Sequence, residues 1–420
     1  MLLDNSLKIV FGLIVGVWVA RYVGPDNFGK INYALAFITL FSSVSGLGLN
    51  EIVVRDILIF PSHSNKIMGT SFILKVLASV VTALLSIFIA LIFFKEDKDV
   101  VIISIILSFT LLFKTAEIIK CWNEAKLQVK YSVIIENIVF TIMTGLKVAV
   151  IVYKLSYLYI VWITLLESIL VFFLLLYFYN FKDNKLTNLS FDVTEAKRLF
   201  RDSWPLMFSS LAIMIYMKID QIMLGKMIGS KGVGDYTAAL RISEIWYMFP
   251  MLIVTSVFPK ILEAKKVSIK KFNIKVKLMF DILVNFSILI SIIITFFSSK
   301  IIYYLYGSNF ASSSPILKIH IWASVFVFMG VASSKLYTTD NLQKISMYRT
   351  LSGAILNIIL NLFLIPKYQG VGAAWATVIS YSFVAYFLDF FSLKTRYLFY
   401  IKTKSLFTFP NIILNLKKND

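Results

Sequence analysis

Several charged side chains lie inside stretches of the sequence that are otherwise apolar. Lys218 and Asp220 interrupt the apolar run from 204 to 225, and Glu167 lies in the middle of VWITLLESILVFF. A charge in a membrane-spanning helix is costly, so such residues usually face a wet cavity or the interior of a helix bundle and are candidates for function. Lys218 and Asp220 cannot pair with each other, because helical residues two apart point to different faces.

The composition of the chain is that of a membrane protein. Of its 420 residues, 59% are hydrophobic and only 15% are charged, whereas soluble domains carry about 25% charged residues. The net charge of +19 would suggest nucleic acid for a soluble protein, but in a membrane protein it is the expected excess of lysine and arginine in cytoplasmic loops. A single cysteine, Cys121, and two isolated histidines indicate neither a disulfide framework nor a metal site, so no cofactor and no nucleic-acid partner is expected.

The elements that must position the charged residues are about 12 membrane-spanning helices, since each needs about 20 mostly apolar residues. The predicted segments are 3–23, 31–54, 68–94, 100–120, 131–153, 157–180, 200–225, 234–259, 278–298, 313–335, 345–366 and 371–393. Their connections are alternately rich and poor in lysine and arginine, with roughly 27 basic residues on one side and about 9 on the other. This asymmetry predicts that both termini are cytoplasmic, and the short outer loops predict that the helix bundle itself is the functional part.

Two stretches of the chain resemble each other at an offset of about half its length. YVGPDNFGKINYALA (22–36) aligns with MIGSKGVGDYTAALR (227–241), which matches Gly24 with Gly229 and Gly29 with Gly234. Each stretch connects the first predicted helix of its half to the second. Six helices precede the return of the pattern, so the halves have the same orientation, as in transporters built from parallel repeats that bind substrate between them.

The helix junctions are similar to those of a known transporter family. ARYVGPDNFGKINYALAF (20–37), GLGLNEIVVRDI (46–57), KIDQIMLGKMIGSKGVGDYTAALRISEIWYMFPMLIVTSVFP (218–259) and LNIILNLFLIPKYQGVGAAWATVISY (356–381) resemble the Wzx-type polysaccharide flippases of the multidrug/oligosaccharidyl-lipid/polysaccharide (MOP) transporter superfamily. The similarity extends over nearly the whole chain. Gln369 departs from the pattern, because a glycine is common at this place in the Tyr-Gly turn.

The resemblance implies an all-α polytopic membrane protein with a MATE-like fold, in which two six-helix lobes enclose a central cavity. The predicted N-terminal lobe is 1–181, followed by a cytoplasmic linker at 182–199, a C-terminal lobe at 200–393 and a cytoplasmic tail at 394–420. The resemblance also implies a multi-pass protein of the bacterial inner membrane. Its implied substrate is undecaprenyl-pyrophosphate-linked O-antigen or a related repeat unit, with membrane lipids and other polysaccharide-assembly proteins as further partners.

The pyrophosphate of such a substrate calls for lysine or arginine donors. The candidates are Lys147, Lys75, Lys114 and Arg241. For each of them an ion pair between helices is an alternative to a substrate contact. Lys114 and Glu117, three residues apart, can pair with each other, whereas Glu136 and Lys147 lie on nearly the same helix face and mark a polar stripe. Glu167 is expected to be protonated or paired with a lysine of the fourth or fifth helix, because an unpaired charge there is very costly.

Other ionisable residues are candidates for gating or ion coupling. They are Lys218, Asp220, Glu244 and Glu167. Counted along their helices, Asp220 and Arg241 lie roughly 14 and 12 Å from the outer turn, and Lys218 and Glu244 both lie roughly 16 Å from it. These depths predict two pairs between the seventh and eighth helices, Asp220 with Arg241 and Lys218 with Glu244.

Two alternatives to a flippase stay open. A drug or cation antiporter of the same superfamily would favour an acidic cavity, and the excess of lysines in the predicted helices argues against it. A membrane-bound polysaccharide polymerase or ligase would need a sizeable external loop and an acid–base constellation with clear spacing, and the sequence favours neither. The chain is therefore predicted to be a transporter and not an enzyme.

Overall fold

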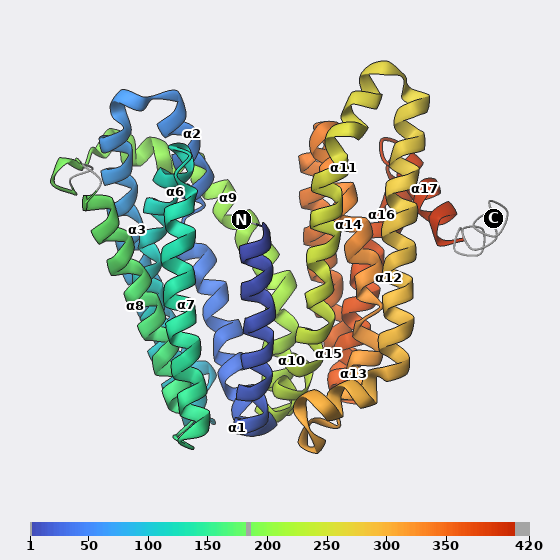
Figure 1. Cartoon of the computed structure of the whole chain (residues 1–420), viewed down its shortest axis with the longest axis horizontal. Helices are drawn as coiled ribbons and strands as arrows, with labels where there is room; N and C mark the ends of the chain where they lie inside the picture. The colour runs from blue at the N-terminus through green and yellow to red at the C-terminus, as the bar shows by residue number, and fades with distance from the viewer. Residues whose placement is uncertain (1, 182–185, 408–420) are drawn as a thin grey trace. The chain divides into compact units, whose positions relative to one another are not determined.

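The computed structural model of the chain describes residues 2–181 and 186–407, which are predominantly helical and include no strand. The chain forms two compact units, Met1–Gly225 and Lys226–Asp420, and Figure 1 shows the long helices that build each unit. The predicted all-α membrane fold is thereby confirmed. The predicted lobe limits at 181 and 200 stay predictions, and residues 182–185 of the predicted linker and 408–420 of the predicted tail lie outside the described residues.

The helices of the first unit run from the N-terminus to the start of the second half of the sequence. They are α1 (Leu2–Ser45), α2 (Leu49–Ile59), α3 (Ser64–Phe93), α4 (Lys98–Ser108), α5 (Thr110–Phe113), α6 (Glu117–Ala125), α7 (Val129–Val152), α8 (Leu158–Phe181) and α9 (Val193–Ile228). A 3₁₀ turn, η2 (Lys114–Ala116), joins α5 to α6. A buried apolar cluster that includes Ile57, Met68 and Trp122 packs α2, α3 and α6 together.

The helices of the second unit follow in the same manner. They are α10 (Ser230–Glu244), α11 (Met248–Val267), α12 (Ile269–Tyr306), α13 (Ser313–His320), α14 (Ala323–Thr339), α15 (Gln343–Ser382), α16 (Leu388–Phe391) and α17 (Arg396–Leu406). A π-helical segment, η6 (Phe383–Phe387), joins α15 to α16. The main apolar cluster of this unit includes Phe280, Phe328 and Leu398, so it packs α12, α14 and α17 against one another.

Ten stretches of the described residues are helical, long and apolar enough to cross a membrane. Two of them, Phe11–Ile59 and Gln343–Phe391, have 49 residues each, which as a continuous helix would be about 73 Å long at 1.5 Å per residue. A bilayer core is only about 30 Å thick. Both stretches contain a break in the helical backbone, at Gly24 and at Gln369. Each therefore provides two crossings, which brings the ten stretches to the twelve crossings predicted from the sequence.

The repeated junctions share the same backbone conformation. Gly24 has φ 77° and ψ 169°, and its predicted counterpart Gly229 has φ 88° and ψ 175°. Side chains other than hydrogen are disfavoured at such positive φ angles. Both glycines end one crossing and start the next within two residues, so the local geometry supports the internal repeat that the sequence predicts.

Another glycine permits a close approach between helices in the first unit. Gly48 precedes α2 with φ 65°, and a Cβ atom added there would lie 2.6 Å from the backbone nitrogen of Met207 and 2.8 Å from the carbonyl oxygen of Ser203. The backbone of α9 therefore packs directly on the turn between α1 and α2. Any larger residue at position 48 would push these elements apart.

A buried charge cluster fixes the end of the second unit. Asp389 is fully buried and accepts hydrogen bonds from Arg349 (2.7 Å), Lys402 (2.5 Å) and the hydroxyl of Tyr337 (2.8 Å). Lys402 also donates to the carbonyl oxygen of Ala385 in the π-helical segment at 2.7 Å. Burial lowers the pKa of Lys402, and the charge of Asp389 opposes this shift. Because Lys402 belongs to α17, part of the predicted tail is a helix held against the unit.

Candidate functional site

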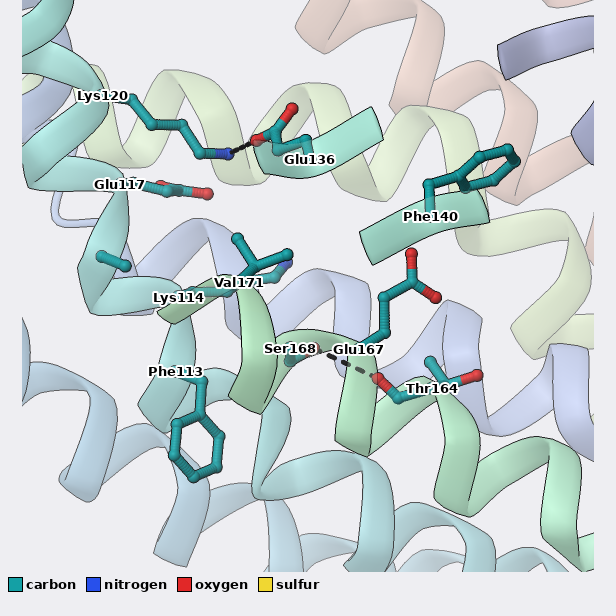
Figure 2. A pocket seen from close by; sticks show the side chains of 11 residues that line it. Phe113, Lys114, Glu117, Lys120, Glu136, Phe140, Thr164, Glu167, Ser168 and Val171 are labelled. Carbon is teal, nitrogen blue, oxygen red and sulfur yellow. Dashed lines mark hydrogen bonds and ion pairs between the residues drawn. The ribbon is translucent and has the colours of Figure 1, made fainter. Parts of the chain in front are cut away.

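A polar pocket of about 350 Å³ lies within the first unit, where η2 and the helices α6, α7 and α8 meet (Figure 2). Its lining combines charged, hydroxyl and aromatic side chains. These are Phe113, Lys114, Ala116, Glu117, Lys120, Glu136, Phe140, Thr164, Glu167, Ser168 and Val171. All of the contributing helices belong to stretches that are apolar enough to cross a membrane, so the pocket is an ionic site inside the membrane-spanning part of the unit.

The 3₁₀ turn η2 determines which side chains of the fourth crossing enter the pocket. It interrupts the crossing Lys98–Ala125 between α5 and α6. Short 3₁₀ pieces within a long helix often mark a hinge or a functional position. Lys114, Glu117 and Lys120 follow one another at intervals of three across this turn, and all three line the pocket.

Lys75 and Glu117 form an ion pair between α3 and α6. Lys75 comes from α3 and is 1% exposed, and its Nζ donates to Oδ1 of Asn50 at 2.5 Å and lies 3.6 Å from Oε2 of Glu117. The amide of Asn50 also donates to Glu117 at 3.4 Å. This buried lysine is thus satisfied by protein groups, as the structural alternative for Lys75 proposes.

Two further ion pairs connect neighbouring helices. Lys120 of α6 pairs with Glu136 of α7, and Figure 2 shows the two side chains pointing toward each other. Lys147 of α7 pairs with Glu167 of α8 at 3.2 Å. Pairing with a lysine of the fifth predicted helix is one of the two states that the sequence allows for Glu167, and it means that the ammonium group of Lys147 is already engaged by a carboxylate.

Lys114 differs from the other three lysines. Its ammonium group forms no hydrogen bond and no ion pair within 4.0 Å with the residues that the structure describes, and its side chain is exposed to the pocket. Lys114 and Glu117, which the sequence allows to pair, are therefore not within ion-pair distance, although their opposite charges still attract each other. The carboxylate of Glu117 is instead engaged by Lys75 and Asn50, which leaves the charge of Lys114 without a close counter-ion.

The pocket consequently favours an anion. Four lysines (Lys75, Lys114, Lys120 and Lys147) and three glutamates (Glu117, Glu136 and Glu167) lie in or around it. Three of the lysines pair with a glutamate, so the excess positive charge is that of Lys114, which has no carboxylate within 4.0 Å among the described residues. An ammonium group that is held in a membrane-spanning segment is stabilised by a charge-assisted hydrogen bond to a phosphate or carboxylate oxygen. The hydroxyls of Thr164 and Ser168 and the ring of Phe140 line the same space and offer contacts to an uncharged part of a ligand.

The remaining predicted site residues lie elsewhere. Lys218 and Asp220 belong to α9, where Asp220 is 6% exposed. Arg241 and Glu244 belong to α10, in the second unit. The proposed pairs Asp220 with Arg241 and Lys218 with Glu244 join residues of different units, so both pairs stay predictions. Arg241 is not part of the pocket in the first unit.

Sequence reasoning missed one residue that lines the pocket, Lys120, and one that contacts its ion pairs, Asn50. Lys120 ends the predicted helix 100–120 and is not among the predicted site residues, although it lies within α6 and lines the pocket. In a regular helix a residue six positions from Lys114 points about 120° away from it, so the spacing gives no signal that both residues face the pocket. Asn50 was noted only as part of a motif between the first two crossings. Nothing in its local sequence indicates that it contacts a lysine 25 residues later.

The chain is similar in sequence to known families and proteins. A family model described as polysaccharide biosynthesis protein matches residues 1–265, and another, described as MatE, matches residues 205–363. The probable low-salt glycan biosynthesis flippase Agl15 of Haloferax volcanii is 28% identical over 218 residues, which are 48% of this chain and 44% of that protein. An uncharacterized membrane protein of Methanocaldococcus jannaschii is 27% identical over 201 residues, 48% of this chain and 46% of that protein. The aligned region spans less than half the length of these curated relatives.

Solved structures share the fold. The lipid II flippase MurJ in an inward closed conformation superposes with a TM-score of 0.76 at 17% identity, covering 98% of this chain and 92% of that one. An inward-facing MATE multidrug transporter of the MOP superfamily gives a TM-score of 0.65 at 14% identity, covering 98% and 96%. Since the polysaccharide biosynthesis protein model covers more than half of the sequence, the chain belongs to the polysaccharide biosynthesis protein family.

Proposed function

We propose that this chain is a flippase that moves a lipid-linked oligosaccharide across the membrane by alternating access. The observation that carries the proposal is Lys114, a lysine without a close counter-ion in a polar pocket of the membrane-spanning helices. A lipid-linked glycan combines a phosphate group with hydroxyl-rich sugars. Lys114 would contact the phosphate, while hydroxyl and aromatic side chains of the pocket would contact the sugar.

The family resemblance suggests a more specific identity for the substrate. We propose undecaprenyl-pyrophosphate-linked O-antigen or a related repeat unit, carried from the cytoplasmic to the periplasmic leaflet of a bacterial inner membrane with both termini in the cytoplasm. Membrane lipids and other polysaccharide-assembly proteins are the proposed partners. The relatedness of the chain to a glycan biosynthesis flippase supports the substrate class, and the excess of basic residues on one side supports the orientation.

Deletion of the gene in its native host tests this function. A transporter is expected to leave completed lipid-linked repeat units on the cytoplasmic leaflet, where they are protected from a glycosidase added to intact spheroplasts. Wild-type protein expressed from a plasmid should make the repeat units accessible to the glycosidase again. If surface glycan stays normal while drug sensitivity rises, the chain is the alternative drug or cation antiporter. If exported repeat units accumulate outside but stay unpolymerised, it is a polymerase or ligase.

A further inference from the structure

A second polar pocket, of about 360 Å³, lies within the second unit. Three connections between crossings form it: the junction before α10, the segment that begins α13, and the break inside α15. Its lining residues are Ile228, Lys231, Gly232, Asp235, Ser312, Pro315, Ile316, Tyr368, Gln369, Gly370 and Val371. The predicted topology puts all three connections on the outer side of the membrane, so this pocket is distinct from the intramembrane site of the first unit.

Gln369 lies in this pocket with a backbone conformation that suits glycine. Its φ is 52° and its ψ is −132°, a combination that non-glycine residues adopt only where the surroundings impose it, often at a functional site. The chain thus holds a strained residue where a glycine would fit, and what it gains is an amide side chain at the mouth of the pocket.

Asp235 supplies a buried carboxylate to the same pocket. Its side chain belongs to α10 and is 5% exposed. The hydroxyl of Ser313 donates to Oδ1 at 3.3 Å, and Oδ2 has no hydrogen bond with any residue in the described part of the chain. A buried carboxylate normally accepts several hydrogen bonds, so Asp235 retains acceptor capacity toward a ligand.

The chemistry of these groups selects a hydroxyl-rich ligand. Lys231 lines the pocket together with Asp235, so their charges balance and the pocket has no excess positive charge that would favour a phosphate. Ca²⁺ would need six to eight oxygen ligands, whereas no group of three or more His, Cys, Asp or Glu residues is assembled in the described ranges. A carboxylate accepts hydrogen bonds from hydroxyls, and the amide of Gln369 both donates and accepts. Tyr368, which is 57% exposed, also lines the pocket. Its aromatic ring offers an apolar face against which a sugar ring can pack.

We propose that this pocket binds a saccharide unit of the transported glycan after it reaches the outer side. Asp235 and Gln369 would bind its hydroxyls, and Tyr368 would pack against the ring. The identity of the ligand rests on the proposed function, because the saccharide belongs to the lipid-linked substrate. The two pockets would then divide the substrate between them, with the phosphate recognised in the first unit and a sugar in the second.

The test compares two glycine variants of the full-length protein. Gln369→Gly and Lys154→Gly replace residues with the same φ of 52°, but Lys154 lies in the turn between α7 and α8, outside the pocket. Both changes relieve backbone strain, so both should raise the midpoint of thermal unfolding. The probe is the free oligosaccharide that mild acid releases from the host's lipid-linked glycan, and its dissociation constant is measured by thermal shift.

Only the pocket variants should lose affinity. Gln369→Gly and Asp235→Asn are expected to bind the oligosaccharide at least about tenfold more weakly, the loss typical of a hydrogen bond to a charged or strongly polar group. Lys154→Gly should bind like the wild type. Equal binding by all variants, or no binding by the wild type, would overturn the pocket assignment. Lipid-linked glycan flipping by the same wild-type preparation is measured separately, so failure of transport is distinguishable from failure of saccharide binding.

Discussion

At the scale of single residues, the four lysines of the first unit differ in how their charge is balanced. Lys75, Lys120 and Lys147 each have a glutamate within ion-pair distance. Lys114 has none among the described residues, although it lines the same pocket. Paired lysines hold helices together, whereas a lysine without a counter-ion is available to a substrate. Lys114 is therefore the residue on which the transport proposal depends.

Replacing Lys114 by glutamine should reduce transport without reducing stability. Loss of one charge-assisted hydrogen bond of about 1.5–3 kcal/mol corresponds to roughly tenfold to hundredfold weaker substrate binding. The unfolding free energy should change by less than about 0.5 kcal/mol, because no ion pair is broken. Substrate affinity and thermal unfolding of the purified protein measure the two effects. Lys98→Gln, at an exposed lysine that begins α4, is the matched control and should leave both unchanged.

Replacing Asp389 in the second unit should, in contrast, reduce the stability of the protein. Asp389→Asn removes the counter-charge of Arg349 and Lys402, which are 5% and 0% exposed. Removing one partner of a buried ionic cluster typically costs about 3–5 kcal/mol, so the purified variant should unfold at a markedly lower temperature. Asp340→Asn, which breaks the more exposed pair with Lys265, should cost no more than about 1 kcal/mol. A similar effect of both changes would mean that the buried cluster does not hold α17 in place.

At the scale of elements, breaks in the helices decide where side chains of the site lie. The 3₁₀ turn η2 joins α5 to α6 and carries Lys114, which lines the pocket of the first unit. The break at Gln369 divides α15 into two crossings and forms one wall of the second pocket. Both interruptions fall inside apolar sequence, and each contributes residues to the lining of a pocket.

The two repeated junctions should respond alike to substitution. Gly24→Ala and Gly229→Ala each put a side chain at a positive φ with an extended ψ, and since no atom lies within 4 Å of an added Cβ, the cost is that of the backbone alone, about 1–3 kcal/mol. Gly145→Ala is the control, because Gly145 lies inside α7 and also has free space. That change should stabilise the protein by about 0.5–1 kcal/mol. Thermal or denaturant unfolding measures all three, and unequal costs at the two junctions would contradict the structural repeat.

The sequence predicts the elements better than the contacts between them. The crossings, the repeat at Gly24 and Gly229, and the candidate charges of the first unit follow from apolar length and pattern. The partner of each charge does not, because it depends on the rotation of each helix about its axis. Glu117, for example, lies within ion-pair distance of Lys75 of α3 and not of Lys114, and no local spacing indicates that contact. Lys402 was missed because a lysine after the last apolar segment resembles an ordinary tail residue, although α17 folds back and buries it.

At the scale of the whole molecule, the distribution of lysine and arginine predicts which connections face the cytoplasm. The connection between α11 and α12 carries Lys266, Lys270 and Lys271, all exposed. The connection between α7 and α8 carries only Lys154. A membrane protein with this asymmetry is expected to keep its basic connections in the cytoplasm.

Cysteine labelling tests this orientation. In a Cys121→Ser background, which removes the single native thiol, Lys270→Cys should react with a membrane-impermeant maleimide only after the cells are opened. Lys154→Cys should react in intact cells. The reverse pattern would invert the topology and with it the proposed direction of transport.

The central claim, that the chain moves a lipid-linked glycan by means of an anion-binding pocket in its first unit, is tested most directly by flipping in reconstituted vesicles. Lipid-linked repeat units from the host, labelled on the sugar, are incorporated into vesicles with or without the protein, and their exposure to an added glycosidase is followed over time. Wild-type protein should make the inner-leaflet pool accessible, and Lys114→Gln should slow this by at least about tenfold. Equal rates in protein-free vesicles and in those with wild-type protein, or equal rates for wild type and Lys114→Gln, would contradict the account.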